Sequence, residues 1–259
     1  MTNNKLLAFL NGLSLIVALY VNYLATAKQI FGVSMKDMSD KYANLFTPAP
    51  YAFSIWGFIY LFLIAFVGYQ IYQIKTKKYD NSISQVGPWF AIANFGNALW
   101  IVAFMNDMVL ESVGVMLVIL YSLIRITLKT NMERWHAPAK TIAFVWRPIS
   151  FYFGWITVAT IANITALMVS LGYDGSPLSP QLWTILLMVV ATIIYLIMIW
   201  KRSMWEYSLV GVWGLIAIAV KNWDNEQSIA YTAIGLALII FINSGIHGFQ
   251  NKKTLPFFK

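Results

Sequence analysis

The sequence predicts an all-α, polytopic membrane protein, a helix bundle with about eight transmembrane helices. Hydrophobic residues make up 59% of its 259 residues and charged residues only 11%, whereas a soluble domain has roughly 45–50% and about 25%. The apolar residues form blocks long enough for a helix to cross a hydrocarbon core about 30 Å thick. Because lipid offers the backbone no hydrogen-bond partners, each block is expected to be helical.

The apolar blocks define the expected spans in chain order. They lie at about 6–26, 51–74, 88–106, 109–127, 148–171, 182–200, 205–221 and 228–248. Only Met105 to Met108 separate the third and fourth spans, and only Lys201 to Met204 separate the sixth and seventh. Each of these pairs is therefore expected to form a tight antiparallel hairpin. The seventh span is the shortest and carries Glu206 near its start.

The basic residues give the expected orientation, because short cytoplasmic loops collect Lys and Arg. Of the 18 basic residues, all but four would lie on one side of an eight-span bundle. The four on the other side are Lys28, Lys36, Lys41 and Lys221. This asymmetry places both termini in the cytoplasm. It also argues against nucleic-acid binding as the cause of the net charge of +8, since the basic residues lie in separated turns.

The N-terminal span resembles a secretory signal in having Lys5 before it and Ala25-Thr26-Ala27 after it. Its apolar run is about 19 residues, longer than the roughly 7–15 of a signal core. We therefore expect this span to be retained in the membrane.

Residue types that carry familiar chemistry are scarce. The chain has no cysteine, which excludes disulfides and thiolate metal sites. Its two histidines, His136 and His247, lie in a loop and near the end of a span, so a histidine metal site is not expected. The ten acidic residues lie in loops or at span ends, and no nucleophile with its base or carboxylate pair is visible. We therefore expect a protein that is not an enzyme.

The longest connection on the expected outer side runs from residue 27 to 50. Two interpretations stay open for it. It could be a solvated connector, or it could be a lid over a pocket that opens outward, because long loops in compact domains are often functional.

Within the spans, aromatic rings and amides recur at helical spacings. Trp56 and Tyr60 are four residues apart and share a helix face. The candidate ligand-binding residues chosen on this basis are Trp56, Tyr60, Asn97, Trp100, Tyr152, Trp155 and Asn163. Tryptophans near span ends are better explained by interfacial anchoring. For Asn97 and Asn163, hydrogen bonding between helices and ligand contact are both open.

Three of these groups resemble a known family. The tetrad Asn97-Ala98-Leu99-Trp100, the pair Trp56 and Tyr60, and the eight-residue step from Trp155 to Asn163 resemble the helix signatures of the tryptophan-rich sensory protein family. This family is also called the translocator protein or peripheral benzodiazepine-receptor family. The resemblance implies a five-helix unit at 1–171, followed by three additional membrane helices at 172–259.

The resemblance also implies a function. We expect a binding or sensory membrane protein whose aromatic pocket takes flat apolar ligands such as porphyrins or sterol-like molecules, since such rings stack on Trp and Tyr. No cofactor is required; porphyrin or haem would be a ligand, held by stacking rather than through an axial residue. The alternative is a small-molecule permease, which the eight spans favour. Porphyrin breakdown is a third possibility, which the resemblance alone implies, since the sequence offers no catalytic constellation for it. The expected partners are membrane lipid and a small apolar ligand, a homodimer stays open, and the expected location is a bacterial cytoplasmic membrane.

Overall fold

A computed structural model of the chain describes residues 2–27, 31–134, 137–173 and 175–250. Four basic residues used above for the orientation, Lys28, Lys252, Lys253 and Lys259, and the loop residue His136 lie outside these ranges. Within the described ranges all regular secondary structure is helical, which confirms the predicted class.

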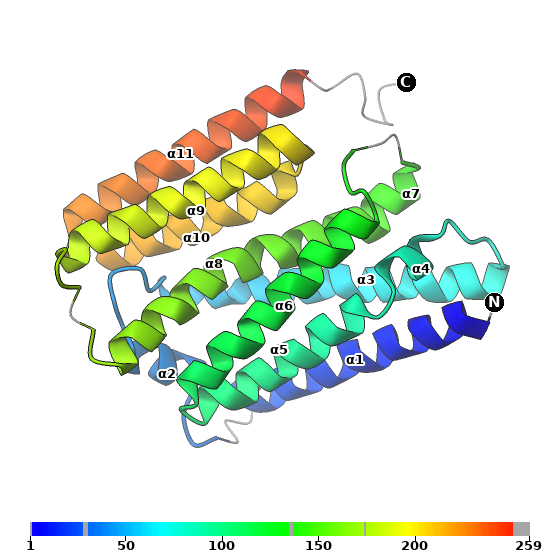
Figure 1. The fold of residues 1–259 in the computed structure, drawn as a ribbon, viewed down its shortest axis with the longest axis horizontal. Coiled ribbons are helices and arrows are strands. Elements are labelled where there is room, and N and C mark those ends of the chain that lie inside the picture. Colours follow the sequence, from blue (N-terminus) through cyan, green and yellow to red (C-terminus); the bar gives the residue numbers. More distant parts are fainter. Residues whose placement is uncertain (1, 28–30, 135–136, 174, 251–259) are drawn as a thin grey trace. The chain divides into compact units, whose positions relative to one another are not determined.

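The helices follow one another with short connections (Figure 1). They are α1 (Thr2–Ala27), α2 (Met35–Lys41), the 3-10 helix η1 (Pro50–Ser54), α3 (Ile55–Thr76), α4 (Ser82–Val86), α5 (Trp89–Met105), α6 (Val109–Lys129), α7 (Ala139–Thr141), the π-helical stretch η2 (Ile142–Trp146), α8 (Arg147–Ser170), α9 (Pro180–Arg202), α10 (Trp205–Asn222) and α11 (Gln227–Gln250).

Each expected span coincides with one of the longer helices, but not all of these helices have the length and hydropathy of a membrane span. Six segments of the described chain are long and apolar enough to cross a membrane. The helix α5 is apolar but has only 17 residues, and α10 is not among the six. The count of eight spans and the orientation of the termini therefore stay predictions.

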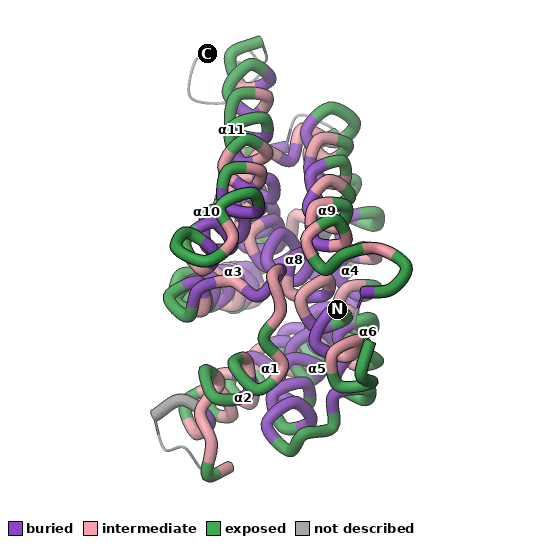
Figure 2. Tube along the Cα trace, turned by 90° about the vertical axis from the view of Figure 1, so that its left-hand side faces the viewer, coloured by how far each residue is buried: buried purple, intermediate pink, exposed green. Residues whose placement is uncertain are grey.

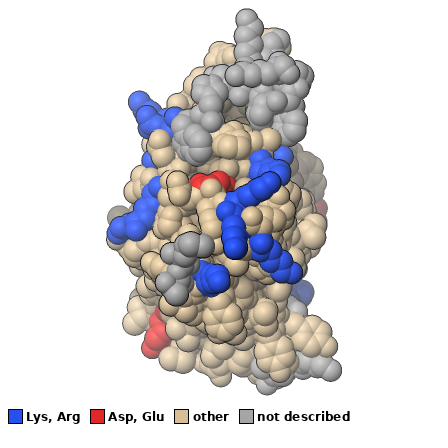
Figure 3. Space-filling view, turned by 90° about the vertical axis from the view of Figure 1, so that its right-hand side faces the viewer, with Lys and Arg blue, Asp and Glu red and all other residues tan. Residues whose placement is uncertain are grey.

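The surface of the helices is consistent with a membrane environment. Buried and exposed stretches alternate along their turns (Figure 2), and large apolar side chains such as Phe9, Leu61 and Leu110 are each more than 60% exposed. Most of the described surface in the space-filling view belongs to residues that are neither basic nor acidic (Figure 3). Extended exposed apolar surface, as at Phe9, Leu61 and Leu110, marks a membrane or protein interface. Together with the six long apolar helices, this surface identifies the chain as an integral membrane protein.

The chain divides into two compact units. The first contains Met1–Met38 and Trp56–Phe153, and the second contains Ser39–Ile55 and Gly154–Lys259. The segment before α3 thus belongs with the C-terminal helices. The boundary expected at residue 171 stays a prediction.

In the first unit, α5 packs against both α1 and α6. Small residues allow this close approach: a Cβ on Gly96 would lie 2.8 Å from Cγ1 of Ile119 in α6. A buried hydrogen bond from Asn11 Nδ2 to Gln70 Oε1, 3.1 Å long, joins α1 to α3. Between membrane helices, such bonds satisfy polar groups for which lipid offers no hydrogen-bond partner.

In the second unit, α10 packs against α9 and α11, and two glycines set its approach to other helices. A Cβ on Gly211 would meet the ring of Tyr195 at 2.5 Å, and a Cβ on Gly154 in α8 would lie 2.5 Å from the carbonyl oxygen of Tyr207. The Tyr195 hydroxyl donates to the Gly154 carbonyl oxygen at 2.9 Å. Glycine is therefore required where α8 meets α10.

Asp80 follows the C-terminal end of α3 and connects three segments of the first unit by hydrogen bonds. Its carboxylate accepts hydrogen bonds from the Tyr69 hydroxyl at 2.9 Å, the Thr141 hydroxyl at 3.0 Å and the Ser82 amide at 3.0 Å. Burial alone would raise the pKa of Asp80, but these hydrogen bonds outweigh it and lower the pKa below its ordinary value.

The lowered pKa predicts the pH dependence of stability. A carboxylate with a lower pKa in the folded state stabilises the fold above the unfolded pKa of about 4, and this stabilisation is lost as pH falls through the folded pKa. Asp80→Asn is expected to cost about 1.5 kcal/mol at pH 7, the low end for bonds to a charged group. Thermal unfolding in detergent at pH 7 and pH 3 measures it: the difference between wild type and variant should be smaller at pH 3 than at pH 7. The exposed Asp224→Asn is the control, and an equal difference at the two pH values would contradict the assignment.

Candidate ligand-binding site

An aromatic cluster forms in the first unit around the N-terminal turns of α3. The rings of Trp56 and Tyr60 stack with centroids 5.3 Å apart and planes 24° from parallel. Tyr152 presents its edge to Trp56 at 5.8 Å, and its hydroxyl donates to the Ala93 carbonyl oxygen of α5 at 3.1 Å. All three rings are less than 10% exposed. Helical spacing on α3 therefore aligns two rings, and the start of α8 adds the third.

A triangle of hydrogen bonds connects this cluster to α1 and α5. Asn22 Nδ2 donates to both the Tyr60 hydroxyl and Asn97 Oδ1, the latter at 3.2 Å. The Tyr60 hydroxyl in turn donates to Asn97 Oδ1 at 3.0 Å. One amide oxygen thus accepts from two different helices, and it fixes the polar edge of the Tyr60 ring.

The amide nitrogen of Asn97 lies at the same place but is not bonded. Asn97 is 1% exposed, and its Nδ2 is buried with no hydrogen-bond partner among the described residues. An unsatisfied buried donor costs about 1–3 kcal/mol. A carbonyl, carboxylate or pyrrole-type acceptor on a ligand would remove this cost.

The other three predicted residues are placed differently. Trp100 is buried but stacks on Phe104, with centroids 5.6 Å apart. Trp155 and Asn163 belong to the second unit, where the Trp155 ring meets the edge of Phe53 at 6.1 Å and Asn163 is 5% exposed. The structure therefore joins Trp56, Tyr60, Asn97 and Tyr152 in one cluster. Their role in binding stays a prediction.

Asn22 is the member of the site that sequence analysis missed. A signal for it exists, because Asn11 and Asn22 are the two amides within the apolar part of α1 and lie 11 residues apart. Eleven residues are close to three turns at 3.6 residues per turn, so both amides share a face. That face is the buried one at Asn11, which is 0% exposed.

Two further observations describe what the structure offers for ligands. Among the described residues, no group of three or more His, Asp or Glu side chains could hold a metal ion. A pocket of about 470 Å³ lies in the second unit, and none of the seven predicted residues lines it.

Comparison with family models matches residues 8–246 to the family described as TSPO-like protein. The chain belongs to the TSPO-like protein family. The resemblance noted in the sequence is thereby confirmed, and the match continues past residue 171 into α11. Searches of curated proteins and of solved structures found no match. For this TSPO-like protein, family membership and the membrane helix bundle together support a binding or sensory role.

Proposed function

We propose that this TSPO-like protein binds flat, largely apolar molecules, such as porphyrins or sterol-like compounds, at the cluster of Trp56, Tyr60 and Tyr152. The observation that carries the proposal is the combination of stacked rings with the unpaired amide nitrogen of Asn97. Rings supply stacking area, and a single buried donor supplies orientation in an otherwise apolar site.

The cluster is closed in the structure, because its rings are buried and touch one another. A ligand would have to insert beside Trp56 by displacing a ring contact. Indole and phenol rings exchange a ring partner for a ligand ring at small net cost, since both contacts are stacking contacts. Binding therefore depends on the faces of Trp56 and Tyr60 more than on an existing void.

The decisive experiment is a titration of the purified protein in detergent with protoporphyrin, followed by the absorbance shift of the porphyrin itself. Wild type is expected to saturate at micromolar ligand. Trp56→Phe should raise the Kd about 2- to 10-fold, the value of one aromatic contact. Trp200→Phe is the matched control, because Trp200 is 47% exposed and lies in the second unit.

Two outcomes would contradict the proposal: no saturable shift at micromolar porphyrin, or equal Kd values for Trp56→Phe and wild type. The permease alternative is separated by the same protein in liposomes. A binder shows no time-dependent accumulation of radiolabelled substrates inside the vesicles, whereas a permease does.

A further inference from the structure

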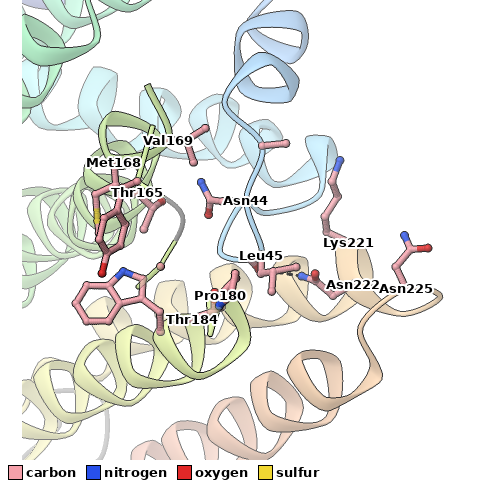
Figure 4. A pocket seen from close by; sticks show the side chains of 14 residues that line it. Asn44, Leu45, Thr165, Met168, Val169, Pro180, Thr184, Lys221, Asn222 and Asn225 are labelled. Carbon is pink, nitrogen blue, oxygen red and sulfur yellow. Dashed lines mark hydrogen bonds between the residues drawn. The ribbon is translucent and has the colours of Figure 1, made fainter. Parts of the chain in front are cut away.

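The described residues that line the pocket of about 470 Å³ all belong to the second unit, and none of the seven residues that sequence analysis selected is among them. Its walls come from the segment 43–45, the C-terminal turns of α8, the loop before α9 with the first turns of α9, and the C-terminal end of α10 (Figure 4). A volume of this size is within the roughly 300–1,000 Å³ of small-molecule sites.

The segment that closes one side of the pocket is fixed to α10. Asn222 Nδ2 donates to the Leu45 carbonyl oxygen at 3.0 Å, and the Ala49 amide donates to the Ala217 carbonyl oxygen at 3.0 Å. Farther along, Trp213 Nε1 donates to the Ala52 carbonyl oxygen at 3.1 Å. Backbone groups on this segment thus have their partners on one helix, so the wall is formed before any ligand arrives.

The two sides of the pocket differ in chemistry (Figure 4). Met168 and Thr165 of α8 and Pro180 of α9 lie on one side, and Lys221, Asn222 and Asn225 lie on the other. The lining also includes Val169, Tyr173 and Trp183, and the rings of Tyr173 and Trp183 meet edge to face at 6.3 Å. The pocket therefore combines apolar and aromatic side chains with amides and a cation.

Among the described residues that line the pocket, Lys221 carries the charge and none is Asp or Glu. Its Nζ lies 3.3 Å from Asp40 Oδ1, in a pair whose side chains are 34% and 37% exposed. Ion pairs this exposed contribute little, about 0–1 kcal/mol. An incoming carboxylate can therefore take the place of Asp40 beside Lys221 at small cost.

We propose that this pocket is a second ligand site, which binds a small amphipathic carboxylic acid. The apolar ring of the acid packs against Met168 and Trp183, and its carboxylate bonds Lys221 and the amide of Asn225. This site is independent of the porphyrin-type site proposed above, because the two share no residue.

The test uses a matched pair of probes, naphthalene-1-acetate and its neutral amide, naphthalene-1-acetamide. Equilibrium dialysis against the protein in phosphatidylcholine nanodiscs measures both. Wild type should bind the acid saturably and more tightly than the amide. Lys221→Gln should weaken the acid about fivefold, the upper range for an exposed ion pair, and leave the amide unchanged. Met168→Trp, which fills the apolar side, should abolish binding of both.

Lys75→Gln removes a cation from the exposed end of α3 and should change neither affinity. If Lys221→Gln does not fold, Asn225→Asp places a negative charge on the polar side at an exposed position and should weaken the acid alone.

Three results would overturn the proposal. They are absence of saturable binding of either probe, an equal loss of acid and amide in Lys221→Gln, and displacement of the acid when phosphatidylglycerol replaces phosphatidylcholine. The last result would assign the pocket to an anionic lipid. Porphyrin binding should be the same in Lys221→Gln and wild type, so failure of this site and failure of the porphyrin site are told apart.

Discussion

Gly154→Ala is expected to destabilise the second unit strongly. The new Cβ would lie 2.5 Å from the Tyr207 carbonyl oxygen and 2.9 Å from Val210 Cβ. A backbone carbonyl inside a helix cannot move aside as a flexible side chain can, so α8 and α10 must separate. Overpacking of this kind costs about 1–3 kcal/mol. Separation would also strain the bond from the Tyr195 hydroxyl to the Gly154 carbonyl oxygen.

Thermal unfolding and resistance to proteolysis in detergent measure this prediction. The matched control is Gly57→Ala in α3, because Gly57 is exposed and a Cβ there has nothing within 4 Å. Alanine at an unobstructed helical site gains about 1 kcal/mol in helix propensity, so the control should be neutral or stabilising. Equal melting temperatures for Gly154→Ala and wild type would mean that α8 and α10 do not pack as described.

Asn97→Ala should produce the second large effect, because it removes an acceptor shared by two donors, of which the Tyr60 hydroxyl is buried. Asn22 Nδ2 and the Tyr60 hydroxyl both donate to Asn97 Oδ1. The Tyr60 hydroxyl loses its acceptor at a buried position, where an unsatisfied group costs about 1–3 kcal/mol. Asn22 Nδ2 loses one bond but keeps the Tyr60 hydroxyl as acceptor. The melting temperature should therefore fall, and porphyrin affinity should fall with it.

The matched control for this prediction is Asn94→Ala on the same helix. Asn94 is also 1% exposed, but its Nδ2 donates only to the Phe90 carbonyl oxygen one turn earlier in α5. Its loss breaks a bond within α5 and no hydrogen bond between the described helices, so Asn94→Ala should be much milder. Similar melting temperatures for the two variants would show that the Asn22–Tyr60–Asn97 triangle contributes nothing to stability.

Hydropathy predicted the helices closely, and the reason is physical. In a membrane the length of an apolar block and the length of a helix are set by the same constraint. The span expected at 205–221, for example, is the helix Trp205–Asn222. The two short turns were also predicted, because only a few residues separate the apolar blocks there. In these turns Asp107 and Ser203 adopt left-handed backbone conformations, with φ of 67° and 59°.

The sequence also contains a helix-start signal outside the apolar blocks, which the sequence analysis did not use. The helix α2 begins with a reciprocal capping box, in which the Ser34 amide donates to Asp37 Oδ2 at 2.8 Å and the Asp37 amide donates to Ser34 Oγ at 3.1 Å. The pattern Ser-x-x-Asp is a known helix start, but the sequence analysis treated the segment as a connector. The π-helical stretch Ile142–Trp146 had no comparable signal.

The candidate site was only partly predictable. Spacing on one helix brought out Trp56 with Tyr60, because a shared face follows from the helical repeat. Which helices meet that face depends on tertiary packing, so Asn22 was missed. The pocket beside Lys221 was missed for the same reason. The segments that line it are far apart in the sequence, and no motif in any one of them indicates a binding site. The segment at 27–50 was left open between connector and lid, and its residues 43–45 line that pocket.

The attachment of this segment to α10 bears on the order in which the protein is made. The Leu45 and Ala52 carbonyl oxygens have partners 177 and 161 residues later in the chain, on a helix that the ribosome makes long after them. Until then these groups must be satisfied by water, which favours keeping the segment outside the hydrocarbon core while the early helices insert. The last turns of α10 therefore complete a structure begun 177 residues earlier, so the second unit cannot finish folding before α10 has been made.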